Sequence, residues 1–181
     1  GDHSITYPIM RAIRRHHGRL TLLQIDAHSD LYDTFDGNRY SHACAFARIM
    51  EEKLADRLVQ VGIRAMTGHL SEQATRFGVE VIDMRAWELG TRPAFDAPVY
   101  VSIDLDGIDP AFAPGVGHPE PGGLSVRDVI ELIHNVPGPL VGGDVVEYNP
   151  SVDASGLTAV VAAKLVKELV GSMHTSARNG L

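Results

Sequence analysis

Five short apolar runs, partly β-branched, alternate along the chain with five segments in which apolar residues recur at helical spacing. The apolar runs predict buried strands over residues 20–25, 58–62, 79–82, 99–105 and 140–146. Helical spacing predicts helices over residues 5–16, 42–54, 71–77, 125–134 and 157–169. Because buried strands that alternate with helices form parallel sheets, we expect an α/β fold of three layers, with a mainly parallel β-sheet flanked by helices.

Composition and charge narrow the class of protein. At 181 residues and 44% hydrophobic content, the chain is expected to form a single domain over residues 1–181. Its formal net charge of -7 gives no basic footprint, which argues against nucleic acid as a partner. No apolar run approaches the ~20 residues needed to cross a bilayer, so no membrane partner is expected. The single cysteine, Cys44, excludes an internal disulfide framework and favours a reducing, cytoplasmic setting.

Acidic residues and histidines gather in three clusters, at residues 1–4, 26–30 and 102–110. Asp26 directly follows the first predicted strand, and Asp104 ends the fourth. Ligands of open parallel sheets bind outside the carboxyl ends of the strands, so the clusters lie where a site is expected. If these segments stay extended, side chains two residues apart point to the same side. The pattern therefore predicts a group of converging ligands.

These clusters supply two imidazoles and four carboxylates, which are His3, His28, Asp26, Asp30, Asp104 and Asp106. Six ligands are too many for one ion, whereas carboxylates can bridge a pair. A set rich in oxygen and free of thiolate favours Mn²⁺ over structural zinc. Two ions about 3.5–4 Å apart lower the pKa of a shared water, so the interpretation is a two-metal hydrolytic site.

Each cluster also has a plainer interpretation. Residues 26–30 could be a polar loop that caps a helix, and His3 could be a helix-entry residue with Asp2 or Ser4 as the cap. Asp104 and Asp106 could share a proton or face solvent, with Asp109-Pro110 as a simple turn. Two unpaired carboxylates at a buried strand end would cost several kcal/mol, which a cation would relieve.

Taken in order, the three clusters resemble the ureohydrolase family of arginases and agmatinases, which release urea from guanidino groups. The family pattern Gly-Gly-Asp-His-Ser is met from its second Gly at residues 1–4. Asp-Ala-His-x-Asp is met at residues 26–30, and Ser-x-Asp-x-Asp-x-x-Asp-Pro at residues 102–110. The likeness continues through residues 113–115, 122–124 and 142–150. It implies an arginase-like fold, a homo-oligomer and two Mn²⁺ per subunit, with the N-terminal strands missing because the first motif starts at residue 1.

The resemblance also implies a ligand set for each ion. One ion would be held by His3, Asp26, Asp30 and Asp104, and the other by Asp26, His28, Asp104 and Asp106. It implies that hydroxide between the metals attacks the guanidino carbon, with Asp30 steering it and passing its proton to the leaving nitrogen. Glu147 matches the carboxylate that binds the guanidinium. His42 matches the proton-shuttling histidine of the pocket mouth, although the usual Ser-His-Gly is Ser41-His42-Ala43 here.

Substrate choice within the family is less constrained. Arginases place an Asn two residues after the second motif, where this chain has Tyr32. Together with an agmatinase-like loop over residues 113–124, this makes agmatine, cleaved to putrescine and urea, the expected substrate. Guanidinobutyrate and arginine are alternatives. His69 is interpreted as a surface histidine and His118 as a residue of the pocket rim.

Two readings from other classes are open. The chain could be an inactive, truncated metal-binding remnant, which the start at Gly1 favours and the intact ligand set opposes. A two-metal phosphoesterase would share the His and Asp ligands. It would also need cationic groups for phosphate, and none stands beside the motifs.

Overall fold

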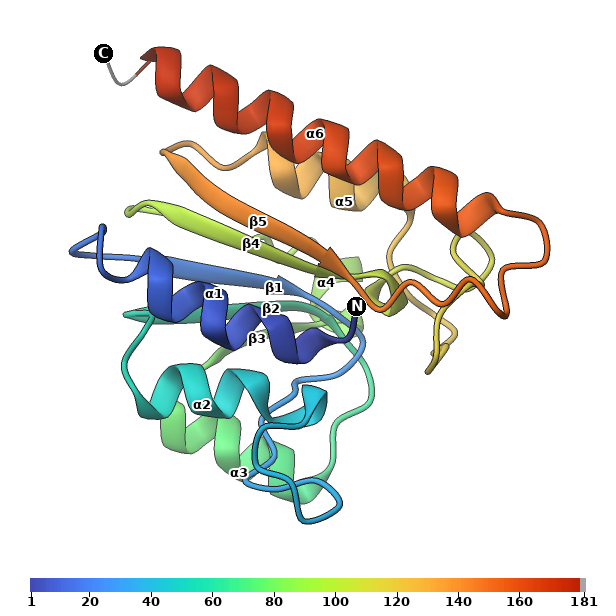
Figure 1. Cartoon of the computed structure of the whole chain (residues 1–181), viewed down its shortest axis with the longest axis horizontal. Helices are drawn as coiled ribbons and strands as arrows, with labels where there is room; N and C mark the ends of the chain where they lie inside the picture. The colour runs from blue at the N-terminus through green and yellow to red at the C-terminus, as the bar shows by residue number, and fades with distance from the viewer. Residues whose placement is uncertain (180–181) are drawn as a thin grey trace.

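Five strands form one parallel sheet in the computed structural model, which describes residues 1–179 and the side chains of residues 1–176 (Figure 1). The strands are β1 (Thr21–Ile25), β2 (Arg57–Ile63), β3 (Glu80–Asp83), β4 (Val99–Asp104) and β5 (Leu140–Val146). Their order across the sheet is β3-β2-β1-β4-β5, and every neighbouring pair is parallel. The five predicted strands are confirmed.

Helices cover both faces of the sheet. One face carries α1 (Thr6–Ile13), α2 (Ala45–Glu51) and α3 (Gly68–Phe77), and the other carries α4 (Met84–Glu88), α5 (Val126–His134) and α6 (Leu157–Asn179). Neighbouring residues of β1 serve the two faces, because Leu22 packs in the core beneath α1 and α2 whereas Leu23 packs in the core beneath α5 and α6. This alternation builds the three layers that the sequence predicts.

Some predicted bounds are wrong. The helix expected over residues 42–54 is a 3₁₀ turn (His42–Cys44) followed by the shorter α2. The helix expected over residues 5–16 is shorter, since α1 begins after a 3₁₀ turn (His3–Ile5) and ends at Ile13. Helix α4 was not predicted, because five residues with one buried side chain, Trp87, carry too little periodicity.

The sheet order places three strand ends side by side. Ile25 of β1 pairs with Ile103 of β4, which in turn pairs with Val145 of β5. The residues that follow these strands therefore emerge at the same edge of the sheet. Among residues 1–179, no helix is both long and apolar enough to cross a bilayer.

Candidate functional site

The segment after β1 turns sharply instead of staying extended. Asp30 has a φ of 51°, in the left-handed region that non-glycine residues rarely adopt. The carboxylate of Asp26 accepts a hydrogen bond from the backbone N–H of His28 at 2.7 Å, which closes a tight turn. The expectation that an extended backbone aligns these side chains is therefore wrong. They converge because the chain curls around them.

A second turn follows β4. Asp104 ends the strand, and its side chain accepts a hydrogen bond at 2.8 Å from the backbone N–H of Asp106, in the 3₁₀ turn Leu105–Gly107. Gly107 lies directly against the first turn, since a Cβ at this position would stand 2.7 Å from the Asp26 nitrogen. Glycine is required here so that the two ligand-bearing turns touch backbone to backbone.

His3 closes one side of the cluster. Its ring is fully buried, and its Nδ1 lies 3.1 Å from an oxygen of Asp30 and 3.2 Å from oxygens of Asp26 and Asp104. No hydrogen bond of good geometry joins this nitrogen to a described residue. A buried nitrogen that faces three carboxylates is the arrangement expected of a metal ligand.

His28 closes the other side. Its Nδ1 lies 3.0 Å from an oxygen of Asp106 and 3.7 Å from the second oxygen of Asp26. Ligand atoms lie within 4.8 Å of one another in two groups, His3 with Asp26 and Asp30, and Asp26 with His28 and Asp106. Asp26 belongs to both groups, one oxygen to each. The structure thus brings all six predicted ligands together around a shared carboxylate.

Burial and mutual repulsion strongly shift the pKa values of the carboxylates. Desolvation, with the charge of Asp26 nearby, raises the pKa of Asp30 to about 6 and that of Asp106 to about 6. The same two causes raise the pKa of Asp104 well above its usual range. Burial alone would raise the pKa of Asp26, but His28 and His3 outweigh burial and hold this pKa well below the ordinary value. The cluster therefore cannot hold four bare negative charges without cations.

The two histidines take up part of this negative charge. Burial alone would lower the pKa of His28, but Asp106 and Asp26 outweigh it and raise it to about 11. His3 is likewise raised well above its normal pKa, because Asp104, Asp26 and Asp30 outweigh its burial. Protons thus occupy positions that divalent cations would take, and the buried, oxygen-rich donor set fits a pair of Mn²⁺ ions.

Behind His3 lies a buried polar network that the sequence did not reveal. Nε2 of His3 lies 2.8 Å from Oγ of Ser102, which donates to Asp144 at 2.7 Å. Tyr100 and Thr6 donate to the other oxygen of Asp144, at 2.8 and 3.1 Å. The available signal was an aspartate, Asp144, inside the otherwise apolar β5.

Glu147 lies immediately after β5 and faces the same space. The backbone N–H of His3 donates to its carboxylate at 2.6 Å, and its own N–H donates to the carbonyl of Gly1 at 2.9 Å. Its φ of 63° is again left-handed. Two of the predicted catalytic residues, Asp30 and Glu147, therefore have strained backbones, a feature that clusters at functional sites.

A cavity of about 180 Å³ opens above the cluster. Its lining includes His28, Asp30, Asp104, Asp106 and Glu147. A larger cavity, of about 460 Å³, lies between the end of α5, the loop before β5 and α6, away from these carboxylates. Of the two cavities, the smaller one is lined by candidate metal ligands.

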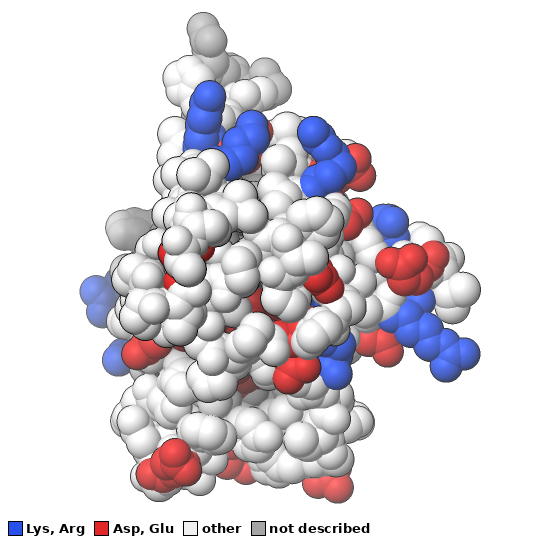
Figure 2. Space-filling view, turned by 90° about the vertical axis from the view of Figure 1, so that its right-hand side faces the viewer, with Lys and Arg blue, Asp and Glu red and all other residues white. Residues whose placement is uncertain are grey.

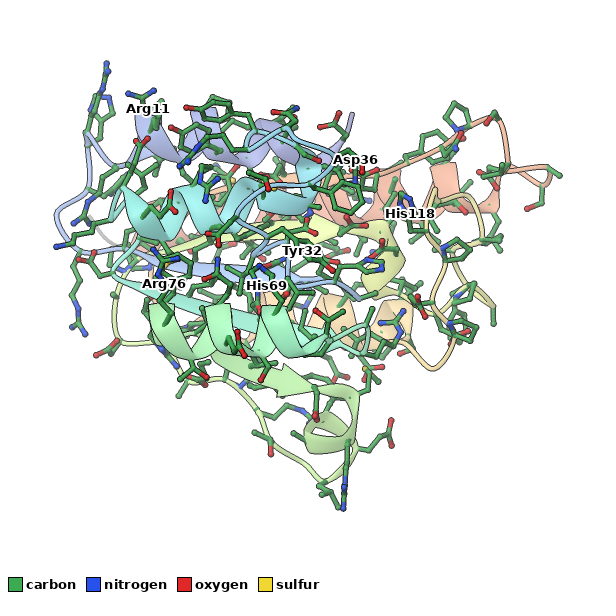
Figure 3. The ribbon with its side chains drawn as sticks, turned by 90° about the horizontal axis from the view of Figure 1, so that it is seen from below. Arg11, Tyr32, Asp36, His69, Arg76 and His118 are labelled. Atoms are coloured by element: carbon green, nitrogen blue, oxygen red, sulfur yellow. The ribbon has the colours of Figure 1, made fainter. Side chains whose placement is uncertain are left out.

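Four aromatic side chains form one wall of this cavity, here named the aromatic wall: Tyr32, Phe35, His42 and His118. Their ring centroids follow one another at 5.7, 5.9 and 5.9 Å. His69 is exposed, as expected, but its ring stacks on Tyr32 at 5.5 Å and supports the wall from outside (Figure 3). The rim position expected for His118 is confirmed by its place in the lining.

Acidic and basic side chains are distributed unevenly on this face. Figure 2 looks onto the carboxyl ends of the strands and shows acidic side chains toward the middle of the face, with most Lys and Arg nearer its edges. The lining residues of the cavity, all within the described part of the chain, include no Lys or Arg. The cavity is suited to a cation such as guanidinium.

Comparison with known proteins decides the family. The sequence model of the arginase family matches residues 1–171. The chain belongs to the arginase family. It is 52% identical to mitochondrial arginase 1 of Arabidopsis thaliana, over 96% of this chain and 53% of that protein. It is 40% identical to guanidinobutyrase of Pseudomonas aeruginosa, over 94% of this chain and 58% of that protein.

Solved structures support the arginase-family fold. Arginase from Medicago truncatula superimposes with a TM-score of 0.88 at 50% identity, over 96% of this chain and 58% of that one. The chain thus spans about half the length of the curated relatives that it matches. The resemblance to ureohydrolases is confirmed at the level of the family, whereas the narrower resemblance to agmatinases is not.

Proposed function

We propose that this arginase-family chain carries the metal centre and guanidino pocket of a ureohydrolase, which cleaves a guanidino group to urea and an amine. The observation that carries the proposal is the convergence of two histidines and four aspartates beneath a cavity that Glu147 also lines. Structural ion pairs do not require three buried aspartates, Asp30, Asp104 and Asp106, in the wall of a cavity.

Two Mn²⁺ ions are the proposed cofactors. His3, Asp26, Asp30 and Asp104 would hold one ion, and Asp26, His28, Asp104 and Asp106 the other. When bound, such a pair supplies an ionised water at neutral pH and stabilises negative charge as it develops. The position of Asp26 between both histidines supports its proposed bridging role.

Three side chains are proposed to handle the substrate and its protons. Glu147, held by the His3 backbone, would accept charge-assisted hydrogen bonds from the guanidinium. Asp30 would orient the attacking water and pass a proton to the leaving nitrogen, a role that suits a carboxylate in the lining of the cavity. His42, in the aromatic wall, would exchange that proton with solvent.

Arginine is the first candidate substrate. Several relatives at 50–52% identity are named arginases, so the expected preference for agmatine receives no support from them. Agmatine is the second candidate because of the residues that line the cavity. The described cavity lining has no Lys or Arg to pair with a substrate carboxylate, and Tyr32 contributes an aromatic face that suits a cation.

A urea-release assay tests the proposal. The Mn²⁺-loaded protein is offered arginine, agmatine, guanidinobutyrate, guanidinopropionate and formiminoglutamate, with p-nitrophenyl phosphate as the arm for a phosphoesterase. We expect urea from a guanidino compound and no phosphate release. Protein that holds two Mn²⁺ per chain and releases no urea from any compound would support the inactive-remnant alternative instead.

A further inference from the structure

The outer part of the aromatic wall stands on an exposed excursion of the chain, here named the mouth loop, residues 32–41. Phe35 and Asn38 exchange backbone hydrogen bonds at 3.1 and 2.9 Å across a tight turn. Asp36 and Gly37 form the turn with φ values of 49° and 74°. Residues 33–40 are all exposed. The mouth loop therefore has little apolar packing of its own to fix its position.

Arg48 of α2 lies beneath this loop. Its side chain is only 2% exposed, although the loop above it is open to solvent. One guanidinium nitrogen donates to the carbonyl of Asp33 at 2.8 Å and to that of Arg39 at 3.0 Å. These two carbonyls stand at opposite ends of the excursion. The buried guanidinium of Arg48 thus connects the outgoing and returning segments of the mouth loop.

Glu51, one turn later in α2, holds the other side of Arg48. Its carboxylate lies 2.8 and 2.9 Å from the remaining guanidinium nitrogens. Arg39 of the mouth loop also donates to Glu51, at 2.9 Å. The planar fork of an arginine spreads its donors over three nitrogens and so contacts two carbonyls and a carboxylate on opposite sides, whereas the three donors of a lysine ammonium share one nitrogen.

We propose that Arg48 is a positioning residue that fixes the mouth loop and thereby sets how tightly the aromatic wall holds the part of a substrate beyond its guanidino group. The inference rests on the proposed function. Arg48 is absent from the cavity lining and from both candidate metal groups. Its loss should leave metal content and guanidinium binding intact while it weakens recognition of the substrate chain.

Two readouts that do not require turnover test this role. Trypsin cleavage after Arg39, followed by mass spectrometry, reports how often the mouth loop opens. The Kd values of arginine, agmatine and methylguanidine for the Mn²⁺-loaded protein report the affinity for the substrate chain, because methylguanidine has no chain to hold. They are measured by rapid mixing before the first turnover for any compound that is cleaved, and by calorimetry for the others. The variants are Arg48→Lys and Arg48→Met. Arg76→Met is the matched control, since exposed Arg76 contacts the Asp33 side chain at 3.4 Å and no loop carbonyl (Figure 3).

Arg48→Lys should raise the rate of cleavage after Arg39. It should also raise the Kd of the better ligand among arginine and agmatine about tenfold, the effect of losing charged hydrogen bonds. The Kd of methylguanidine, the Mn²⁺ content and the behaviour of Arg76→Met should stay close to the wild type. The Lys variant decides the matter if the Met variant does not fold.

Unchanged cleavage in Arg48→Lys would overturn the inference. So would faster cleavage with an unchanged ratio between the Kd of methylguanidine and the Kd of the better ligand among arginine and agmatine. Absence of urea release by a wild-type protein that still shows this ratio would overturn the proposed function alone. Failure of the wild type to bind any of the three compounds would overturn both.

Discussion

His3 and Ser102 lie 99 residues apart, and the Nε2 of His3 stands 2.8 Å from the Ser102 hydroxyl. That hydroxyl donates to Asp144, so its oxygen accepts from Nε2–H and leaves Nδ1 directed at the carboxylate cluster. This is the orientation that a metal-binding imidazole needs.

Removal of this support should weaken the metal site. We expect Ser102→Ala to lower Mn²⁺ affinity by roughly 10–100-fold, the usual effect of losing a partner of a ligating histidine. Metal titration of the purified protein measures it. Ser4→Ala, which removes only an exposed hydroxyl bonded to Asp2, is the control. Equal affinity in both variants would contradict the role of Ser102.

Asp104 is, with Asp26, one of the two carboxylates proposed to hold both ions. Asp104→Ala should abolish Mn²⁺-dependent urea release and lower the number of ions bound, because the residue is buried and faces His3 at 3.2 Å. Metal analysis and the urea assay measure the two effects. Asp109→Ala is a control from the same loop, since Asp109 caps Ala111, Gly122 and Gly123 away from the cluster. Turnover retained by Asp104→Ala would refute the two-metal assignment.

Glu147 should act on the substrate and not on the metals. We expect Glu147→Gln to reduce kcat/KM for the guanidino substrate by roughly 10–100-fold, because a charge-assisted hydrogen bond becomes a neutral one. Mn²⁺ content, measured on the same sample, should be unchanged. Loss of metal from this variant would show that Glu147 supports the His3 backbone instead, through the 2.6 Å hydrogen bond.

Stability of the metal-free protein should fall as the pH rises from about 4 to about 6. Asp30 and Asp106 keep their protons up to about pH 6 in the folded chain, whereas the unfolded chain releases them near the ordinary value of 3.8. The folded state therefore binds more protons in this window, and raising the pH favours unfolding.

Mn²⁺ should reverse that trend, because the ions bind deprotonated ligands and stabilise the folded state more strongly at higher pH. Urea denaturation at pH 4.5 and 6.5, with chelator and with Mn²⁺, measures both slopes. Asp30→Asn should flatten the slope of the metal-free protein. Identical pH dependence with and without Mn²⁺ would be incompatible with ion binding at these carboxylates.

The sequence by itself determined the five strands and the chemistry of the ligands. Apolar periodicity is a local property, so it located five strands, and the residue types at the ends of β1 and β4 indicated metal binding. The order of the motifs was enough to indicate the family, which the match over residues 1–171 confirms.

Tertiary structure decided how these residues meet. The order β3-β2-β1-β4-β5 places Asp26 beside Asp104, which no local pattern specifies, because strand order depends on contacts distant in sequence. The turn at Asp30, in place of an extended segment, follows from a left-handed backbone that the surrounding fold maintains.

The supports of the site were equally hidden. Ser102 and Asp144 meet His3 only when β4 and β5 lie beside the start of the chain, and Arg48 reaches the mouth loop only once α2 packs beneath it. Sequence carries the chemical identity of each side chain. Long-range packing alone sets which buried polar groups become partners, and here it turned separate motifs into one candidate site.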